Sequence, residues 1–134
     1  MSIFSLTCQV GGVEHSVTTE QRVGGFAVLS DEGVQFARGL ERATQCAGEI
    51  LGPHLERARR SGLPWGLLVE VNGNQAVYGE WPLLPGPAEP ERRRQPSTLS
   101  RLRALWRDED GPLAALNNAL RIVEEFGGAQ RAAA

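Results

Sequence analysis

The sequence predicts an α+β fold: an antiparallel sheet of four or five strands, built from two hairpins, covered by one long helix and followed by two C-terminal helices. Three observations lead to this fold class. First, two short turn signals are each flanked by apolar runs on both sides. Second, apolar residues recur at helical spacing over residues 40–61. Third, two further helical patterns of apolar residues follow a proline-rich stretch. Antiparallel hairpins joined through one helix favour a two-layer α+β fold over a parallel α/β fold.

The clearest element is the stretch from Trp65 to Trp81. It reads WGLLVEV, then Asn72-Gly73, then NQAVYGEW. Asn-Gly between two apolar runs is a strong hairpin signal, because both turn residues adopt positive φ at low cost. A two-residue turn then sets three cross-strand pairs on one face of the hairpin: Val71–Asn74, Val69–Ala76 and Leu67–Tyr78. This face of the sheet must be covered by another element.

A first hairpin is expected over residues 3–19. Apolar residues alternate with polar ones before Gly11-Gly12, which supplies a turn. Closure through these two residues gives three cross-strand pairs on one face: Val10–Val13, Cys8–His15 and Leu6–Val17. The apolar residues that match across this register support it.

The stretch after the first hairpin allows two interpretations. A short buried strand over residues 26–29 is followed by Ser30-Asp31-Glu32-Gly33. This tetrapeptide is either the turn of another hairpin, which pairs residues 26–29 with 34–37, or a helix start with Ser30 as its N-cap. We favour a helix that begins between Asp31 and Leu40, because apolar residues recur at steps of three and four: Phe36, Leu40, Ala43, Ala47, Ile50 and Leu51.

The same stripe continues to Gly62, a residue type that suits the left-handed position after a helix, just before Pro64. Gly52-Pro53 interrupts the stripe. Proline removes a backbone hydrogen bond and its ring clashes with the preceding turn, so we expect a kink or a short break near Gly52. This helix is the expected cover for the sheet.

Residues 82–96 are predicted to be a surface linker within a single domain that covers residues 1–134. The stretch holds five of the eight prolines, and proline is excluded from sheet and helix interiors. A helix capped by Ser97 or Thr98 should follow, with four residues inward: Leu99, Leu102, Leu105 and Trp106. Asp110 should cap the last helix, which carries Pro112 in its first turn and an apolar stripe of Leu113, Leu116, Leu120, Val123 and Phe126.

Composition limits the functional classes. The net charge of −2 gives no overall attraction to nucleic acid or anionic membranes. All 14 basic residues are arginine, which excludes a Schiff-base lysine and a phosphate-loop lysine. Cys8 and Cys46 make no disulfide framework, no signal-peptide pattern is present, and no run approaches the roughly 18 apolar residues of a membrane span. We therefore expect a cytoplasmic protein with reduced thiols and no membrane partner.

No metal site, catalytic residue or cofactor is predicted. Cys8 and His15 should face each other, whereas Cys46 and His54 lie about two turns, roughly 12 Å, apart on one helix. No C-x-x-C or H-x-x-x-H spacing is present to preorganise a tetrahedral site. Cys46 lies inside a helix rather than at its N-terminus, where a thiolate would be stabilised, and the Cys8–His15 pair has no identified oxyanion donors. An enzyme is therefore the least favoured class.

Aromatic and arginine side chains are the best candidates for binding a partner, because tryptophan, tyrosine and arginine often dominate protein interfaces. The predicted partner-binding residues are Trp65, Tyr78, Trp81, Arg92, Arg93, Arg94 and Trp106. A packing interpretation competes with this one: Trp65 and Trp81 would close the ends of the sheet, and Trp106 would fill the C-terminal helical pair. Strand edges offer a second route, to a partner or to a second copy of the chain.

The sequence favours a non-catalytic protein–protein interaction module, namely a small adaptor, regulator or inhibitor of the immunity or anti-defence type. The expected partner is another protein, with a homodimer as a further option. The alternative is a nucleic-acid-binding protein that uses the basic segment from Arg92 to Arg107. Against it stand the acids interspersed in and around that segment: Glu89, Glu91, Asp108, Glu109 and Asp110.

Overall fold

A six-stranded antiparallel sheet with two helices on one face forms the fold. The computed structural model describes residues 2–71, 74–81 and 102–127. The strands are β1 (Ser2–Val10), β2 (Val13–Arg22), β3 (Gly25–Ser30), β4 (Gly33–Ala37), β5 (Trp65–Val71) and β6 (Asn74–Gly79). The helical elements are α1 (Leu40–Ser61), the 3-10 turn η1 (Asp108–Asp110), α3 (Gly111–Ile122) and the π-helical turn η2 (Val123–Gly127).

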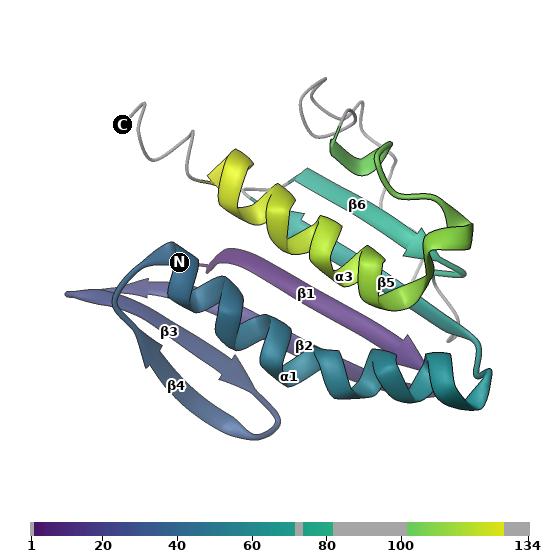
Figure 1. Ribbon diagram of the computed structural model, residues 1–134. Coiled ribbons are helices and arrows are strands. Elements are labelled where there is room, and N and C mark those ends of the chain that lie inside the picture. The colour runs from purple at the N-terminus through teal and green to yellow at the C-terminus, as the bar shows by residue number, and fades with distance from the viewer. Residues whose placement is uncertain (1, 72–73, 82–101, 128–134) are drawn as a thin grey trace.

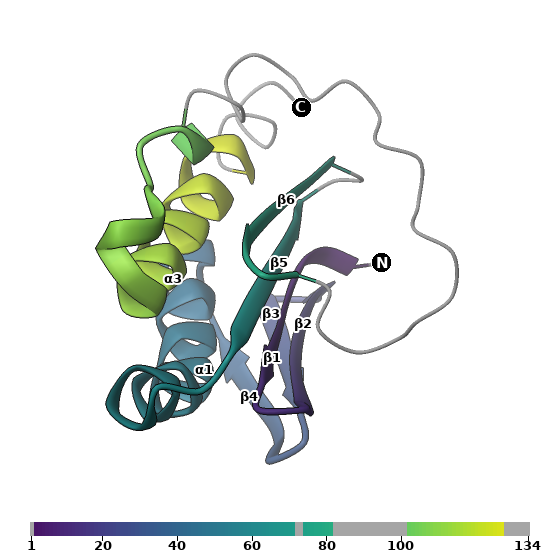
Figure 2. The same cartoon turned by 90° about the vertical axis from the view of Figure 1, so that its right-hand side faces the viewer.

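The strand order is β4-β3-β2-β1-β5-β6. The helices α1 and α3 lie side by side over the sheet (Figure 1). Seen along the sheet, both lie on the same face, and no helix of the described residues covers the other face (Figure 2). The predicted α+β class, with a long helix as the cover, is therefore confirmed.

Both predicted hairpins have the predicted register. In the first, Val10 pairs with Val13, Cys8 with His15 and Leu6 with Val17. In the second, Val71 pairs with Asn74, Val69 with Ala76 and Leu67 with Tyr78. The first strands of the two hairpins, β1 and β5, pair with each other in the middle of the sheet, where Leu6 lies opposite Val69. Two local turn signals thus fixed four of the six strands.

The hairpin alternative for residues 26–37 is correct, and the helix begins at Leu40, at the end of the predicted interval, so Phe36 does not belong to its apolar stripe. Leu29 pairs with Val34 and Phe26 with Ala37, so β4 raises the strand count to six instead of four or five. The Ser30 hydroxyl accepts a 3.2 Å hydrogen bond from the backbone N–H of Glu32, which closes a turn and caps no helix. Pairing with β3 gives alternate residues of the strand, Gly33, Gln35 and Ala37, their backbone hydrogen-bond partners.

Helix α1 begins at Leu40, after Gly39, and runs without a break to Ser61. Of the two expected alternatives near Gly52, the short break is therefore wrong, and the kink stays a prediction. Pro53 lies on the exposed side of the helix, where the missing hydrogen bond costs least because water solvates the free carbonyl group. Gly62 ends the helix as predicted: its φ is 63°, and its N–H and that of Leu63 both point to the Ala58 carbonyl oxygen.

The core lies between the sheet and the two helices. Its fully buried members include Leu6, Val17, Val28, Leu51, Leu55, Leu67, Val69 and Ile122. Helix α3 approaches α1 closely at Gly48, where an added Cβ would lie 2.9 Å from Leu120 Cδ1. The Thr44 hydroxyl lies 2.8 Å from the Glu124 carboxylate and links α1 to η2. Gly48 thus lets α1 and α3 pack closely, and the Thr44–Glu124 contact adds a polar link between α1 and η2.

The C-terminal part differs in detail from the prediction. Leu116 and Val123 are buried as expected, but Leu113 and Leu120 are only half-buried, and the small residues Ala115 and Ala119 occupy the centre of the buried face. Close packing against α1 favours small side chains there, which rotates the buried face.

Two further predictions on this segment need correction. Asp110 occupies the N-cap position of α3 as predicted, but its side chain makes no capping bond; its carboxylate instead accepts a 3.0 Å hydrogen bond from the backbone N–H of Arg107. Leu105, predicted to be inward, is 59% exposed. Of the other predicted C-terminal helix, only the end at Leu102 and Arg103 belongs to the described residues. The linker over residues 82–96 lies outside them, as does the Phe126 side chain.

Replacing Pro53 with Ala should stabilise the protein by roughly 1–3 kcal/mol. The substitution restores a backbone donor inside α1, and the Pro53 side chain is exposed, so no core contact is lost. Chemical denaturation measures the change in the free energy of unfolding. Gly52→Ala is the matched control: an added Cβ meets nothing within 4 Å, so it should stabilise by about 1 kcal/mol. A Pro53→Ala variant less stable than the wild type would contradict this view of the helix.

Candidate functional site

Three of the predicted partner-binding residues meet beside the β5–β6 hairpin. The Trp106 ring lies edge to face with Trp65, with ring centroids 5.8 Å apart at 83°, and with Tyr78, at 5.3 Å and 82°. Edge-to-face contacts bring the positive rim of one ring to the negative face of another. Trp65, Tyr78, Trp106 and Arg103, described next, are together called the aromatic corner.

Arg103 lies over this cluster. Its Cζ atom is 4.6 Å from the Tyr78 ring centroid and 4.8 Å from that of Trp106, within the range of cation–π attraction. Its Nε donates a 2.6 Å hydrogen bond to the carbonyl oxygen of Val77 in β6. One side chain therefore attaches the segment that precedes α3 to the sheet, and its charge is directed inward at the rings.

Asn118 of α3 completes the polar contacts of the corner. Its Oδ1 accepts a hydrogen bond from the Tyr78 hydroxyl, and its Nδ2 donates a 2.7 Å bond to the Leu102 carbonyl oxygen. The Trp106 Nε1–H donates a 2.9 Å bond to the Gly111 carbonyl oxygen. Burial raises the pKa of Tyr78, an effect that Arg103 partly opposes, so the phenol remains a donor at neutral pH. The rings are thus held by directed bonds as well as by packing.

Burial divides the predicted tryptophan and tyrosine residues. Tyr78 and Trp106 are 1% and 5% exposed, which agrees with the packing interpretation, whereas Trp65 and Trp81 are half-buried. Trp81 is held close to the sheet, because an added Cβ on Gly66 would lie 2.8 Å from the Trp81 backbone. Of these four residues, only Trp65 and Trp81 therefore have accessible aromatic surface. Their binding of a partner stays a prediction.

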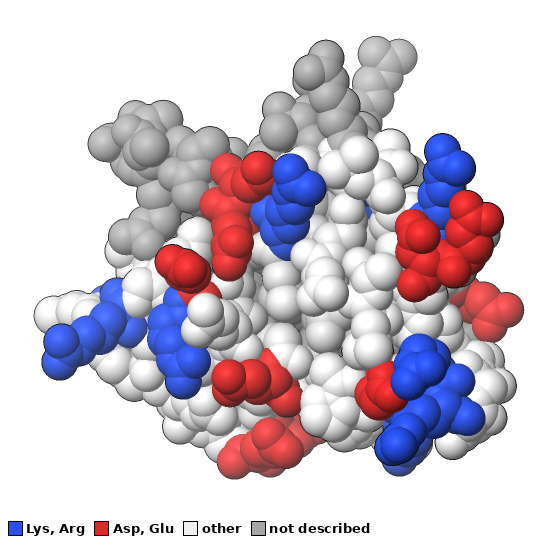
Figure 3. Space-filling model, viewed as in Figure 1, with Lys and Arg blue, Asp and Glu red and all other residues white. Residues whose placement is uncertain are grey.

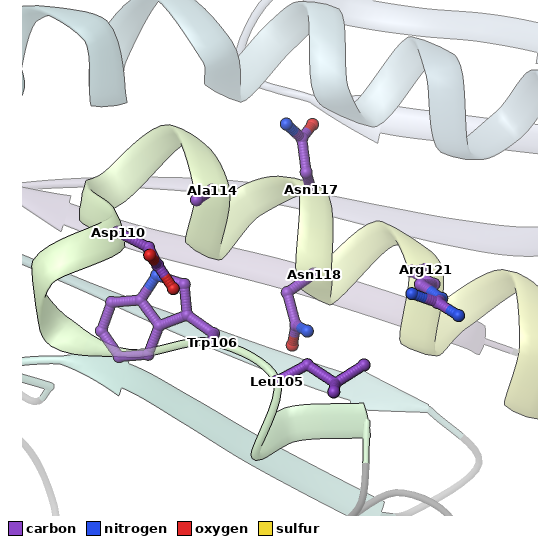
Figure 4. Close-up of a pocket in the computed structure, with 7 residues that line it drawn as sticks. All are labelled: Leu105, Trp106, Asp110, Ala114, Asn117, Asn118 and Arg121. Carbon is purple, nitrogen blue, oxygen red and sulfur yellow. The ribbon is translucent and has the colours of Figure 1, made fainter.

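A hollow of about 230 Å³ adjoins the aromatic corner and shares Trp106 with it. Its lining comprises Leu105, Trp106, Asp110, Ala114, Asn117, Asn118 and Arg121 (Figure 4). Asn118 points toward Leu105, whereas Asn117 points away from it (Figure 4). The volume is below the roughly 300–1,000 Å³ typical of small-molecule pockets, so one protruding side chain is a better match in size.

The described part of the basic segment, residues 102–107, shows little that could bind phosphate. Arg92, Arg93 and Arg94 lie outside the described residues. Arg103 is bound to the rings, and the Arg107 guanidinium lies 3.8 Å from the Glu109 carboxylate. On the face that carries the helices, basic and acidic side chains of the described residues are interspersed (Figure 3). The nucleic-acid interpretation therefore gains no support from this face.

A cluster of titratable residues, separate from the aromatic corner, lies between β2 and α1. The His15 and His54 rings are stacked, with centroids 3.5 Å apart and planes at 11°. The sequence paired His15 only with Cys8, since the contact with His54 depends on where α1 crosses the sheet. Burial raises the pKa of Cys8 to about 12, although Arg57 opposes the shift, so this thiol is a poor nucleophile at neutral pH. Among the described residues, no three His, Cys, Asp or Glu side chains gather in a way that could hold a metal ion.

Acid should destabilise the fold through His54. Burial lowers the pKa of His54, and the neighbouring His15 and Arg57 lower it further, although Glu32 and Asp31 act in the opposite direction. The unfolded imidazole takes up a proton near its ordinary pKa of 6.5, so the unfolded state binds more protons than the folded state just below that pH. Stability is therefore complete above pH 6.5 and is lost as the pH falls toward the lower pKa of the folded state.

The test compares thermal unfolding of the wild type and His54→Gln between pH 7.5 and pH 5. The melting temperature of the wild type should fall more steeply, because glutamine takes up no proton. Parallel curves for the two proteins would show that His54 does not carry the pH dependence.

Replacing Asn118 with Ala should destabilise the protein by about 1–3 kcal/mol, because the Tyr78 hydroxyl and the Leu102 carbonyl lose their partner. The adjacent Asn117 is exposed and is the matched control: Asn117→Ala should change stability by less than about 0.5 kcal/mol. Urea titration of both variants measures the difference. Equal changes in stability for the two variants would show that Asn118 does not hold the aromatic corner in place.

Among the described residues, no helix combines the length and apolar character of a membrane span. Comparisons with protein-family models, with curated proteins and with solved structures gave no match to this chain.

Proposed function

We propose that this protein is a non-catalytic interaction module that binds another protein through the aromatic corner and the adjoining hollow. The observation that carries the proposal is the combination of half-buried Trp65 and exposed Leu105 beside a rigid base of Tyr78 and Trp106. Its biological role would be that of a small adaptor, regulator or inhibitor, of the immunity or anti-defence type.

Rigidity supports this proposal. The buried rings are fixed by edge-to-face contacts, by Arg103 and by the Asn118 bridge. A surface that is already ordered loses less conformational entropy on binding than a mobile one. Aromatic and arginine side chains at a packed centre, with polar residues around them, match the anatomy of energetic hot spots in protein interfaces.

The lining of the hollow indicates the chemistry of the contact. Leu105, Trp106 and Ala114 offer apolar surface, while Asp110 and Arg121 supply polar groups. We therefore expect the partner to insert one apolar side chain, with polar groups around it that meet the rim.

Affinity capture from a lysate of the native host, followed by mass spectrometry, tests the proposal. The tagged wild-type protein should retain a protein partner in stoichiometric amount after nuclease treatment and at moderate salt. Leu105→Arg should lose the partner, because it places a charge at the mouth of the hollow; a loss of at least about tenfold in affinity is expected for a central interface residue.

Val23→Arg is the matched control. Val23 is a fully exposed apolar residue in the turn between β2 and β3, so the same chemical change there should leave binding intact. Retention of the partner by Leu105→Arg would contradict the proposed surface. Loss of all bound material on nuclease treatment would instead favour the nucleic-acid alternative.

A further inference from the structure

The two edges of the sheet differ in what protects their free backbone groups. At the β6 edge, Arg103 donates a hydrogen bond to the carbonyl oxygen of Val77. At the β4 edge, no described residue pairs with the outer side of the strand, and no proline, lysine or bulge interrupts it. An open strand edge of this kind is a template for pairing with another strand.

On the face of the sheet opposite to the helices, β4 carries two exposed apolar side chains. Val34 and Phe36 are 66% and 58% exposed. Their cross-strand neighbours on β3 are Leu29, which is half-buried and adds to the apolar surface, and Ala27, which is buried. A cluster of exposed apolar side chains at the rim of a protein indicates an interaction surface.

The turn between β3 and β4 decides which backbone groups point to the free edge. Asp31-Glu32 form a two-residue turn, so Ser30 and Gly33 are the hydrogen-bonded pair beside it, and Gln35 has the same orientation as Gly33. The N–H and C=O groups of Val34 and Phe36 therefore point away from β3. The same two residues present both apolar side chains and free backbone groups.

A second β4, related by a two-fold axis at Gln35, is complementary to the first. Antiparallel pairing in this register places Val34 of one copy opposite Phe36 of the other, and Glu32 opposite Arg38. Pairs of an aromatic with a β-branched residue, and pairs of opposite charge, stabilise antiparallel strands. The neighbouring registers lose this match, because they place Phe36 opposite Glu32 or Val34 opposite Arg38.

The flanking charges are available for such pairing. Glu32 and Arg38 are exposed, and neither forms an ion pair with another described residue. In the two-fold register each Glu32 meets the Arg38 of the other copy, so two ion pairs flank the apolar pairs. In the shifted registers these two ion pairs do not form.

We infer that a second copy of this chain binds the β4 edge and continues the sheet across a two-fold axis. This inference goes beyond the proposed function, because the edge lies at the opposite side of the sheet from the aromatic corner. Strand β4 has five residues, so the contact is smaller than a standard interface of about 1,600 Å². The dimer should therefore form reversibly, in a concentration-dependent manner.

Sedimentation equilibrium of the full chain over low to high micromolar concentrations tests this interface. The wild type should approach a dimer mass as concentration rises. Phe36→Asp should weaken association by at least about tenfold, because it places a carboxylate in an apolar pair and opposes strand pairing. Val77→Asp, an outward-facing apolar residue at the other edge, is the matched control and should associate like the wild type.

Charge exchange tests the register itself. Glu32→Arg and Arg38→Glu should each weaken the dimer by about tenfold, because each places like charges opposite one another. The double variant should restore the wild-type association. Circular dichroism verifies that every variant is folded. A wild type that stays monomeric at all concentrations, a dimer unaffected by Phe36→Asp, or a double variant as weak as the single ones would overturn the inference.

Discussion

The structure depends on burial of the inner face of the sheet beneath α1. Leu6 and Leu67 on neighbouring strands, together with Leu51 and Leu55 of the helix, have no exposed surface. Removal of such side chains from water is the main favourable contribution to folding. Because α1 covers only part of the sheet, the β5–β6 side needs a second cover, which α3 provides (Figure 1).

The second cover is attached by a few directed contacts, and these create the candidate site. Arg103 bonds to a β6 carbonyl oxygen, and Asn118 bridges Tyr78 and Leu102. Such contacts fix the orientation of the rings in a way that apolar burial alone does not. They also protect the β6 edge, whereas no residue in the described part of the chain protects the β4 edge in this way. The same sheet thus has a rigid aromatic surface at one end and an open strand at the other.

The candidate site was predictable as a set of residue types but not as a place. Trp65, Tyr78 and Trp106 were identified from interface preferences, yet they come from β5, β6 and the segment before α3, so their meeting depends on how these elements pack. Arg103 belonged to the predicted basic segment, but its position over two rings required the folded chain. The stacking of His15 on His54 was missed for the same reason. Arg92, Arg93 and Arg94 lie outside the described residues, so their role stays a prediction.

The sequence by itself determined the elements whose signals are local. Gly11, Gly12 and Gly62 have positive φ and closed the first hairpin and ended α1, because tolerance of positive φ belongs to single residues. The predicted Asn72-Gly73 turn lies outside the described residues, but the strands on either side of it have the predicted register. Only the tertiary structure decided that residues 34–37 form a strand, since the run fits both periodicities and only folding brings β3 beside it. It also decided that α1 continues through Pro53 and which face of α3 is buried. Packing of many side chains outweighs local preferences of about 1–3 kcal/mol per residue, and no single stretch of sequence contains that information.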